Sequence, residues 1–110
     1  MQEWSGSVNA LADQSIVAAA EVSWSGDCIV RLRLDSPVCQ IDYAISDAGI
    51  SSTSLADDAV RSVEIISMAP ASNAYLVRVM FTAALDGAAT ATWTVLDGEA
   101  YLALPSLTTV

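Results

Sequence analysis

Few residues in this chain have the chemistry for acid–base or nucleophilic catalysis. The 110 residues include no histidine and no lysine, and the four basic residues are all arginine. Cys28 and Cys39 are the two cysteines, and each lies in an apolar run with no imidazole in the chain to lower the thiol pKa. A serine nucleophile would lack the same base. We therefore expect no catalytic residue and no enzyme activity.

The carboxylates are the remaining candidates for chemistry. Asp57 and Asp58 are adjacent, but their serine-rich surroundings do not form the cleft that raises one pKa of a catalytic pair. Five aspartates could instead give oxygen ligands to calcium at one end of a β-sandwich, and these are Asp47, Asp57, Asp58, Asp86 and Asp97. No D-x-[DN]-x-[DN]-G pattern supports such a site. The sequence therefore predicts no metal site and no cofactor.

Charge and hydrophobicity limit the kinds of partner. Thirteen acidic residues against four basic ones give a net charge of −9, which repels the phosphate backbone of nucleic acids. Hydrophobic residues make up 54% of the chain, yet charges interrupt the apolar runs before the ~18 residues of a membrane helix. We expect neither nucleic acid nor membrane as a partner, and we expect the excess apolar surface to pack against other subunits. The first five residues lack the basic and apolar regions of a secretory signal, which favours synthesis without export.

Alternation of apolar and polar residues predicts strands along most of the chain. Residues 15–25 alternate, although a helix from Asn9 through Ala20, or a single turn at 9–14, is the alternative because alanine favours helices. Residues 28–34 and 39–45 read as a hairpin with a loop at 35–38. In that register the inward pairs are Leu34 with Cys39, Leu32 with Ile41, Val30 with Tyr43, and Cys28 with Ile45.

The hairpin register bears on the two thiols. It places Cys28 about 17 to 20 Å from Cys39 along the strands, whereas a disulfide tolerates a Cα separation of only about 7 Å. We expect buried free thiols, and a bridge only if the two strands lie in different sheets.

The middle of the chain predicts one exposed connection and two strands. Residues 46–59 are rich in Ser, Asp and Gly, which is typical of a long exposed loop. Residues 60–67 resume a strand with Val63 and Ile65 inward. Residues 74–84 are apolar on both faces, so Leu76 and Met80, on the face opposite Phe81, are candidate contacts with a partner.

Two Asp-Gly pairs, at 86–87 and 97–98, bracket a strand at 88–96. Asp-Gly between apolar runs is a hairpin signal, so we expect a C-terminal three-stranded meander with Trp93 at its centre. Its inward pairs would be Val79 with Trp93, Val77 with Val95, Val95 with Ala100, and Trp93 with Leu102. Thr90, Thr92 and Thr94 would point outward, toward solvent or a partner.

The fold class that follows is all-β. We predict one domain over residues 1–110, an antiparallel β-sandwich or small barrel of about seven or eight strands. Residues 1–8 would be an N-terminal arm or an edge strand. In an arm, Trp4 would anchor on a neighbouring subunit, whereas Trp24 and Trp93 lie on core faces rather than on a sugar-binding platform.

In style, the whole chain resembles the small β-rich structural proteins of tailed-phage virions, such as capsid decoration and tail components. The resemblance rests on the Met1 start, the Ala/Thr/Ser-rich β-domain, the arm-like residues 1–8 and the lack of a catalytic set, and no single motif defines it. It implies a non-enzymatic oligomer, made in the host cytoplasm, that docks on a capsid or tail lattice within the virion. The alternative is an immunoglobulin-like or fibronectin-like adhesion or carbohydrate-binding module of an exported, extracellular protein.

Overall fold

The computed structural model describes residues 3–35, 38–55, 60–69, 74–83 and 86–110. Within them the chain is almost entirely β-structure, and all strand pairings are antiparallel. The strands are β1 (Glu3–Ala10), β2 (Ser15–Asp35), β3 (Val38–Ser46), β4 (Gly49–Leu55), β5 (Val60–Ala69), β6 (Ala74–Thr82) and β7 (Gly87–Thr109). The predicted all-β class is confirmed, with seven strands described.

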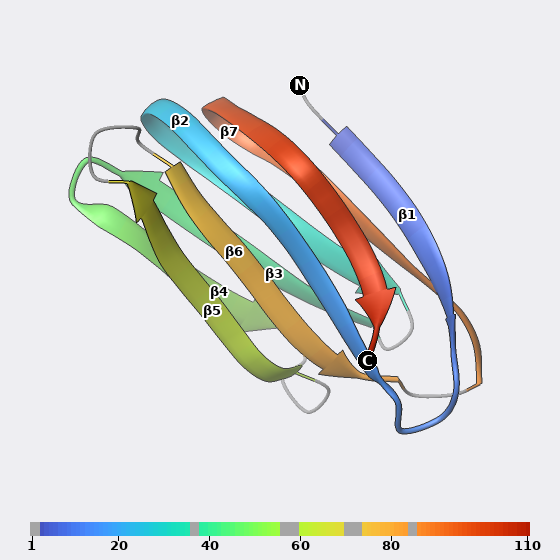
Figure 1. The fold of residues 1–110 in the computed structure, drawn as a ribbon. Helices are drawn as coiled ribbons and strands as arrows, with labels where there is room; N and C mark the ends of the chain where they lie inside the picture. Colours follow the sequence, from blue (N-terminus) through green and yellow to red (C-terminus); the bar gives the residue numbers. More distant parts are fainter. Residues whose placement is uncertain (1–2, 36–37, 56–59, 70–73, 84–85) are drawn as a thin grey trace.

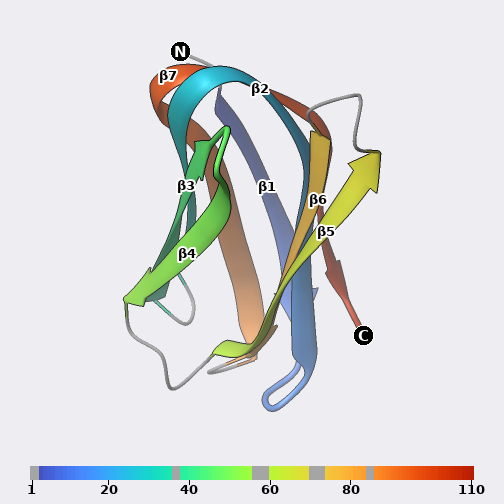
Figure 2. The ribbon, with the colours of Figure 1, turned by 90° about the vertical axis from the view of Figure 1, so that its left-hand side faces the viewer.

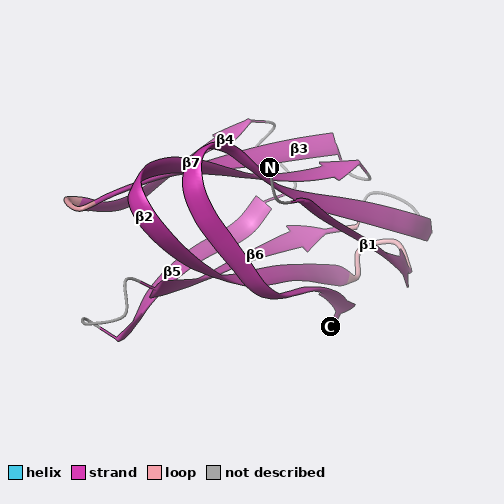
Figure 3. Cartoon of the chain, turned by 90° about the horizontal axis from the view of Figure 1, so that it is seen from above, coloured by secondary structure: helices cyan, strands magenta, loops and turns pink. Residues whose placement is uncertain are grey.

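The strands form two layers joined by the long strands β2 and β7 (Figures 1 and 2). Layer A has the order β1, first part of β7, second part of β2, β3 and β4. Layer B consists of the second part of β7, the first part of β2, β6 and β5. Seen from above, β2 and β7 arch side by side from one layer to the other (Figure 3).

Two glycines with positive φ lie at the bend where β2 and β7 change layers. Gly26 has φ +75° and Gly98 has φ +76°, a region that L side chains rarely adopt. The β2–β7 register shifts between Ser25 and Ile29, so the regular strand pairing is interrupted at the bend. A Cβ on Gly98 would lie 2.8 Å from the Cα of Cys28 and would overlap the carbonyl oxygen of Asp27. Gly98 therefore lets the two strands approach closely at this point.

The hydrophobic core lies between the layers. Its largest fully buried side chains are Trp93, Tyr43 and Phe81. The rings of Tyr43 and Trp93 stack with centroids 6.2 Å apart, and their hydroxyl and indole N–H groups find no hydrogen-bond partner among the described residues. At the edge of the core, Trp24 stacks on Tyr75 at 4.8 Å. The core positions predicted for Trp93 and for the inward residues of 15–25 are confirmed, with Trp24 half-buried.

The structure confirms the β2–β3 hairpin in the predicted register. Cys28 pairs with Ile45, Val30 with Tyr43, Leu32 with Ile41, and Leu34 with Cys39. Asp35 also pairs with Val38, so the connection is shorter than the predicted loop, and residues 36–37 lie outside the described part. Local alternation and a short connection suffice to set this register.

The prediction of a C-terminal three-stranded meander is wrong. β6 pairs with β2 and β5, and β7 pairs with β1 and β2, so no hairpin joins β6 to β7. Val79 lies opposite Ala18 and Val63, and Trp93 lies opposite Trp4 and Leu32.

Each Asp-Gly pair has another role in the fold. Asp97-Gly98 lies within the continuous strand β7, where the positive φ of Gly98 makes a bend instead of a turn. Asp86 accepts a hydrogen bond from the Ala12 amide at the connection from layer B to layer A. Both glycines have positive φ, +138° at Gly87 and +76° at Gly98, but this conformation occurs at bulges and interlayer connections as well as in hairpins.

Two other expectations need correction. Residues 49–55 of the predicted 46–59 loop form β4, whose serine-rich sequence occupies the edge of layer A beside β3, while residues 56–59 lie outside the described part. Strand pairing outweighs the weak strand propensity of serine there. At the N-terminus the edge-strand alternative is right, because β1 pairs with β7 over its whole length. A turn at Leu11–Gln14 replaces the helix alternative before β2.

Candidate functional site

The outer face of layer B carries apolar side chains in rows that cross several strands. Strand register aligns Ile66, Leu76, Glu21 and Ala103 in one row. Another row aligns Met80, Val17 and Thr108. The outward positions alternate with the buried Val77, Val79 and Phe81, so this face follows from the strand period of two.

Several of these apolar side chains are accessible. Ile66 is 45% exposed, Tyr101 67% and Leu104 76%, while Leu76 and Met80 are half-buried. Leu104 also has φ +50°, which is uncommon for a leucine. Isolated exposed apolar residues are ordinary, but neighbouring ones on a sheet face are typical of contact surfaces. We call this set, Val17, Ile66, Leu76, Met80, Tyr101 and Ala103, the apolar face.

Charged groups on the apolar face are few. Arg78 lies between Leu76 and Met80 and donates a hydrogen bond of 2.6 Å to Glu64 across the β5–β6 pair. Glu21 lies opposite Leu76 on β2. The Arg78–Glu64 pair is almost half exposed, so it contributes little to stability. The ion pair nevertheless lowers the desolvation free energy that another surface must overcome when it covers Arg78 and Glu64.

The outer face of layer A carries hydroxyl groups and an ion pair at its centre, with exposed apolar side chains at Ile29, Val38 and Leu96. Thr90, Thr92 and Thr94 point outward on β7, as predicted, between β1 and the second part of β2. The Ser5 and Thr92 hydroxyl groups are hydrogen-bonded at 3.1 Å. Arg31 makes a two-point contact with Asp42, with Nε–Oδ1 at 2.8 Å and a Nη2–Oδ2 hydrogen bond of 3.1 Å. This hydrogen bond to Asp42 raises the pKa of Arg31.

The structure separates the residues that the sequence suggested as one partner interface. Leu76 and Met80 lie together on layer B, and the three threonines lie together on the opposite side of the molecule. Trp4 is half-buried in β1 and packs against the core of its own chain. Sequence reasoning missed Ile66 and Tyr101. The consecutive residues Ile65 and Ile66 place one apolar side chain on each face of β5, and this pattern could have identified Ile66.

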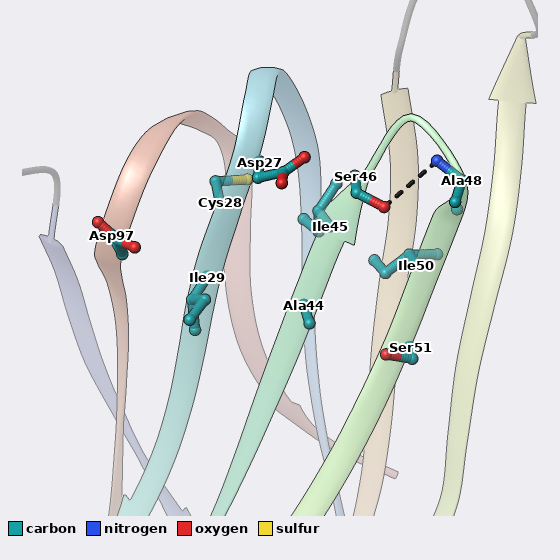
Figure 4. Close-up of a pocket in the computed structure, with 11 residues that line it drawn as sticks. Asp27, Cys28, Ile29, Ala44, Ile45, Ser46, Ala48, Ile50, Ser51 and Asp97 are labelled. Carbon is teal, nitrogen blue, oxygen red and sulfur yellow. Dashed lines mark hydrogen bonds between the residues drawn. The ribbon is translucent and has the colours of Figure 1, made fainter.

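An open hollow of about 470 Å³ lies at the bend, where β7 and β2 meet the β3–β4 turn (Figure 4). Two cross-strand rows line it, the exposed row Ile29–Ala44–Ser51 and the alternating row Cys28–Ile45–Ile50, which faces the core. Asp97 from β7 and Asp27 from β2 bring two exposed carboxylates to its lining. The Ala48 amide donates to the Ser46 hydroxyl oxygen at 3.2 Å on the other side. The hollow thus combines an apolar lining with negative charge.

Both thiols are buried and free. Burial raises the pKa of Cys39 to about 11. Burial, and then the charges of Asp27 and Asp97, raise the pKa of Cys28. A thiol that stays protonated at neutral pH is a weak nucleophile, so the arrangement does not activate either cysteine.

Alkaline pH is expected to destabilise the fold. A raised thiol pKa gives a stability contribution that is present below the unfolded pKa of 9.0 and is lost as pH rises toward the folded value of about 11. Over that window Cys39 lowers the free energy of unfolding by up to about 1.4 kcal/mol per pH unit. Denaturant titrations of the native chain and of Cys39→Ala check this, since the slope against pH should be shallower in the variant. Equal slopes would contradict it.

No group of three or more His, Cys, Asp or Glu side chains is placed to hold a metal ion among the described residues. Within that part there is also no helix with the length and hydrophobicity to cross a membrane. Comparison of the chain with protein-family models, with curated proteins and with solved structures gives no match.

Proposed function

We propose that this chain is a non-enzymatic structural protein of a larger assembly, a virion component such as a capsid decoration protein, made in the host cytoplasm. It acts through protein–protein contacts, with copies of itself or with a capsid or tail lattice. The observation that carries the proposal is the apolar face, where Ile66, Leu76 and Met80 lie on neighbouring strands. Such a face loses unfavourable contact with water when a second surface covers it.

The difference between the two outer faces supports the same function. Layer A carries hydroxyl groups and an ion-paired arginine on its outer face, together with the exposed Ile29, Val38 and Leu96. In layer B, Ile66 and Leu76 lie side by side on β5 and β6, with Met80 farther along β6. A sheet that needs no partner can carry polar residues on its whole outer face. The neighbouring apolar side chains of β5 and β6 therefore favour a contact on layer B.

The proposal predicts that charge on the apolar face weakens assembly. The double substitution Leu76→Glu and Met80→Glu places two unpaired carboxylates in the contact, and we expect the dissociation constant to rise by about tenfold or more. Thr92→Glu with Thr94→Glu is the matched control on layer A, with the same change in charge, and it should assemble normally. All four side chains are half-buried, so denaturant unfolding must show that each double variant folds.

Sedimentation velocity of the chain over a range of concentrations, with and without virion particles from the same source, measures the assembly. Association that the layer B variant weakens and the layer A variant preserves would support the proposal. A chain that stays monomeric and does not sediment with particles would overturn it. Equal effects of both variants would show that the apolar face is not the contact.

A further inference from the structure

The hollow at the bend is distinct from the apolar face, because it is built by layer A and the β3–β4 turn. We infer that it binds an aliphatic cation, a lysine or arginine side chain that a basic partner protein places beside Asp27 and Asp97. This inference rests on the proposed function, and it names the chemistry of the partner at a second contact.

Size and lining fit a long side chain with a charged end. The volume of about 470 Å³ is within the range of small-ligand sites, which runs from about 300 to 1,000 Å³. Small residues leave the space open: Ala44 is exposed, and a Cβ on Gly49 would meet no atom within 4 Å. Ile29 lies beside Ala44 in the exposed row that lines the hollow. Lysine and arginine stems pack along apolar surface of this kind while the charged group stays at the edge.

The electrostatics of the hollow select a cation. Asp27 and Asp97 are exposed, and neither forms an ion pair with a cation of the described residues. Both carboxylates act on the buried thiol of Cys28, where they help burial to raise its pKa. The two aspartate charges that disfavour a thiolate at Cys28 favour a positive group in the exposed space beside them.

A different, basic protein is a better source of the cation than a second copy of this chain. The chain has no lysine, and two of its four arginines, Arg31 and Arg78, are held in ion pairs. With a net charge of −9 on each chain, two copies repel one another at long range, whereas a basic partner is attracted. The hollow therefore fits a basic partner better than a second copy.

Nuclear magnetic resonance titration of the intact, ¹⁵N-labelled chain with N-acetyl-lysine amide tests the site. Chemical-shift changes should concentrate at residues 27–29, 44–51 and 97, and they should weaken as salt is added. N-acetyl-norleucine amide has the same stem without the charge, so we expect clearly weaker binding. Changes spread evenly over the surface, or equal binding of the uncharged probe, would overturn the inference.

Substitutions give the second arm of the test. Asp27→Asn and Asp97→Asn should each raise the dissociation constant of the lysine probe by about two- to fivefold. Asp97 accepts a hydrogen bond from the Gly98 amide, which the asparagine oxygen can still accept. Asp13→Asn, in the turn that precedes β2, is the matched control and should bind like the native chain. Ala44→Leu should fill the hollow and abolish binding, and a variant that folds and binds normally would overturn the inference.

The two proposals fail in different ways. If the lysine probe binds in the hollow while the chain never assembles, the proposed function fails and the site stands. If assembly proceeds unchanged when Ala44→Leu and both asparagine substitutions are combined, the site has no part in assembly and this inference fails while the proposed function stands.

Discussion

Replacing Trp93 with alanine should lower the free energy of unfolding by about 3 to 5 kcal/mol. Trp93 is fully buried and its ring stacks on Tyr43. In the sheet it pairs with Trp4 of β1 on one side and with Leu32 of β2 on the other. The substitution removes the largest side chain of the core at the place where three strands of layer A meet. Because a domain of this size is stable by only about 5 to 15 kcal/mol, much of the population would unfold under mild conditions.

Chemical denaturation of the native chain and the Trp93→Ala variant measures this loss. Tyr43→Phe is the matched control, because it keeps the stacked ring and removes a buried hydroxyl that has no hydrogen-bond partner among the described residues. We expect that control to be neutral or to gain about 1 kcal/mol. A loss below about 1 kcal/mol for Trp93→Ala would mean that the indole is not in the core.

Gly98→Ala should cost about 3 kcal/mol, which is the second large effect we expect. The new Cβ would overlap the Asp27 carbonyl oxygen and lie 2.8 Å from the Cα of Cys28, and both are backbone atoms that cannot move without opening the bend. The positive φ of 76° adds the strain of a left-handed residue, about 1 to 2 kcal/mol.

Gly26→Ala separates these two causes. Its φ is nearly the same, +75°, but a Cβ there meets no atom within 4 Å. We therefore expect only the left-handed strain of about 1 to 2 kcal/mol from this variant. Thermal or denaturant unfolding compares the two, and equal losses would show that β2 and β7 do not approach closely at Gly98.

The sequence predicts local pairing better than long-range pairing, and the two halves of β2 show why. The hairpin of β2 with β3 is correct pair by pair, because alternation fixes which side chains face inward and a short connection fixes the register. The pairing of β2 with β6 and β7 joins residues far apart in the chain, and no local pattern encodes it. The predicted meander is wrong for this reason, because an Asp-Gly sequence such as Asp97-Gly98 is compatible both with a hairpin turn and with a bend inside one strand.

The candidate surfaces divide in the same way. Leu76 and Met80 could be predicted because β6 is apolar on both faces of a single strand. Ile66 and Tyr101 join them only through the strand order of layer B, so their proximity could not be read from the sequence. The hollow is lined from four strands, and its two aspartates are seventy residues apart in the chain. The side chains of Thr90, Thr92 and Thr94 point outward, as the alternation predicts. They lie on the outer face of layer A, whereas Leu76 and Met80 lie on the outer face of layer B.

Hydroxyl-radical footprinting of the assembled and the monomeric chain is the most direct test of the proposal that the apolar face is the contact. Met80 and Tyr101 should be oxidised readily in the monomer and protected in the assembly, because a second surface covers them. Val38, which is 66% exposed on layer A, should react equally in both states and serves as the internal control. Unchanged oxidation of Met80 and Tyr101 in an assembly of confirmed mass would contradict the account, since the chain would then assemble through another surface.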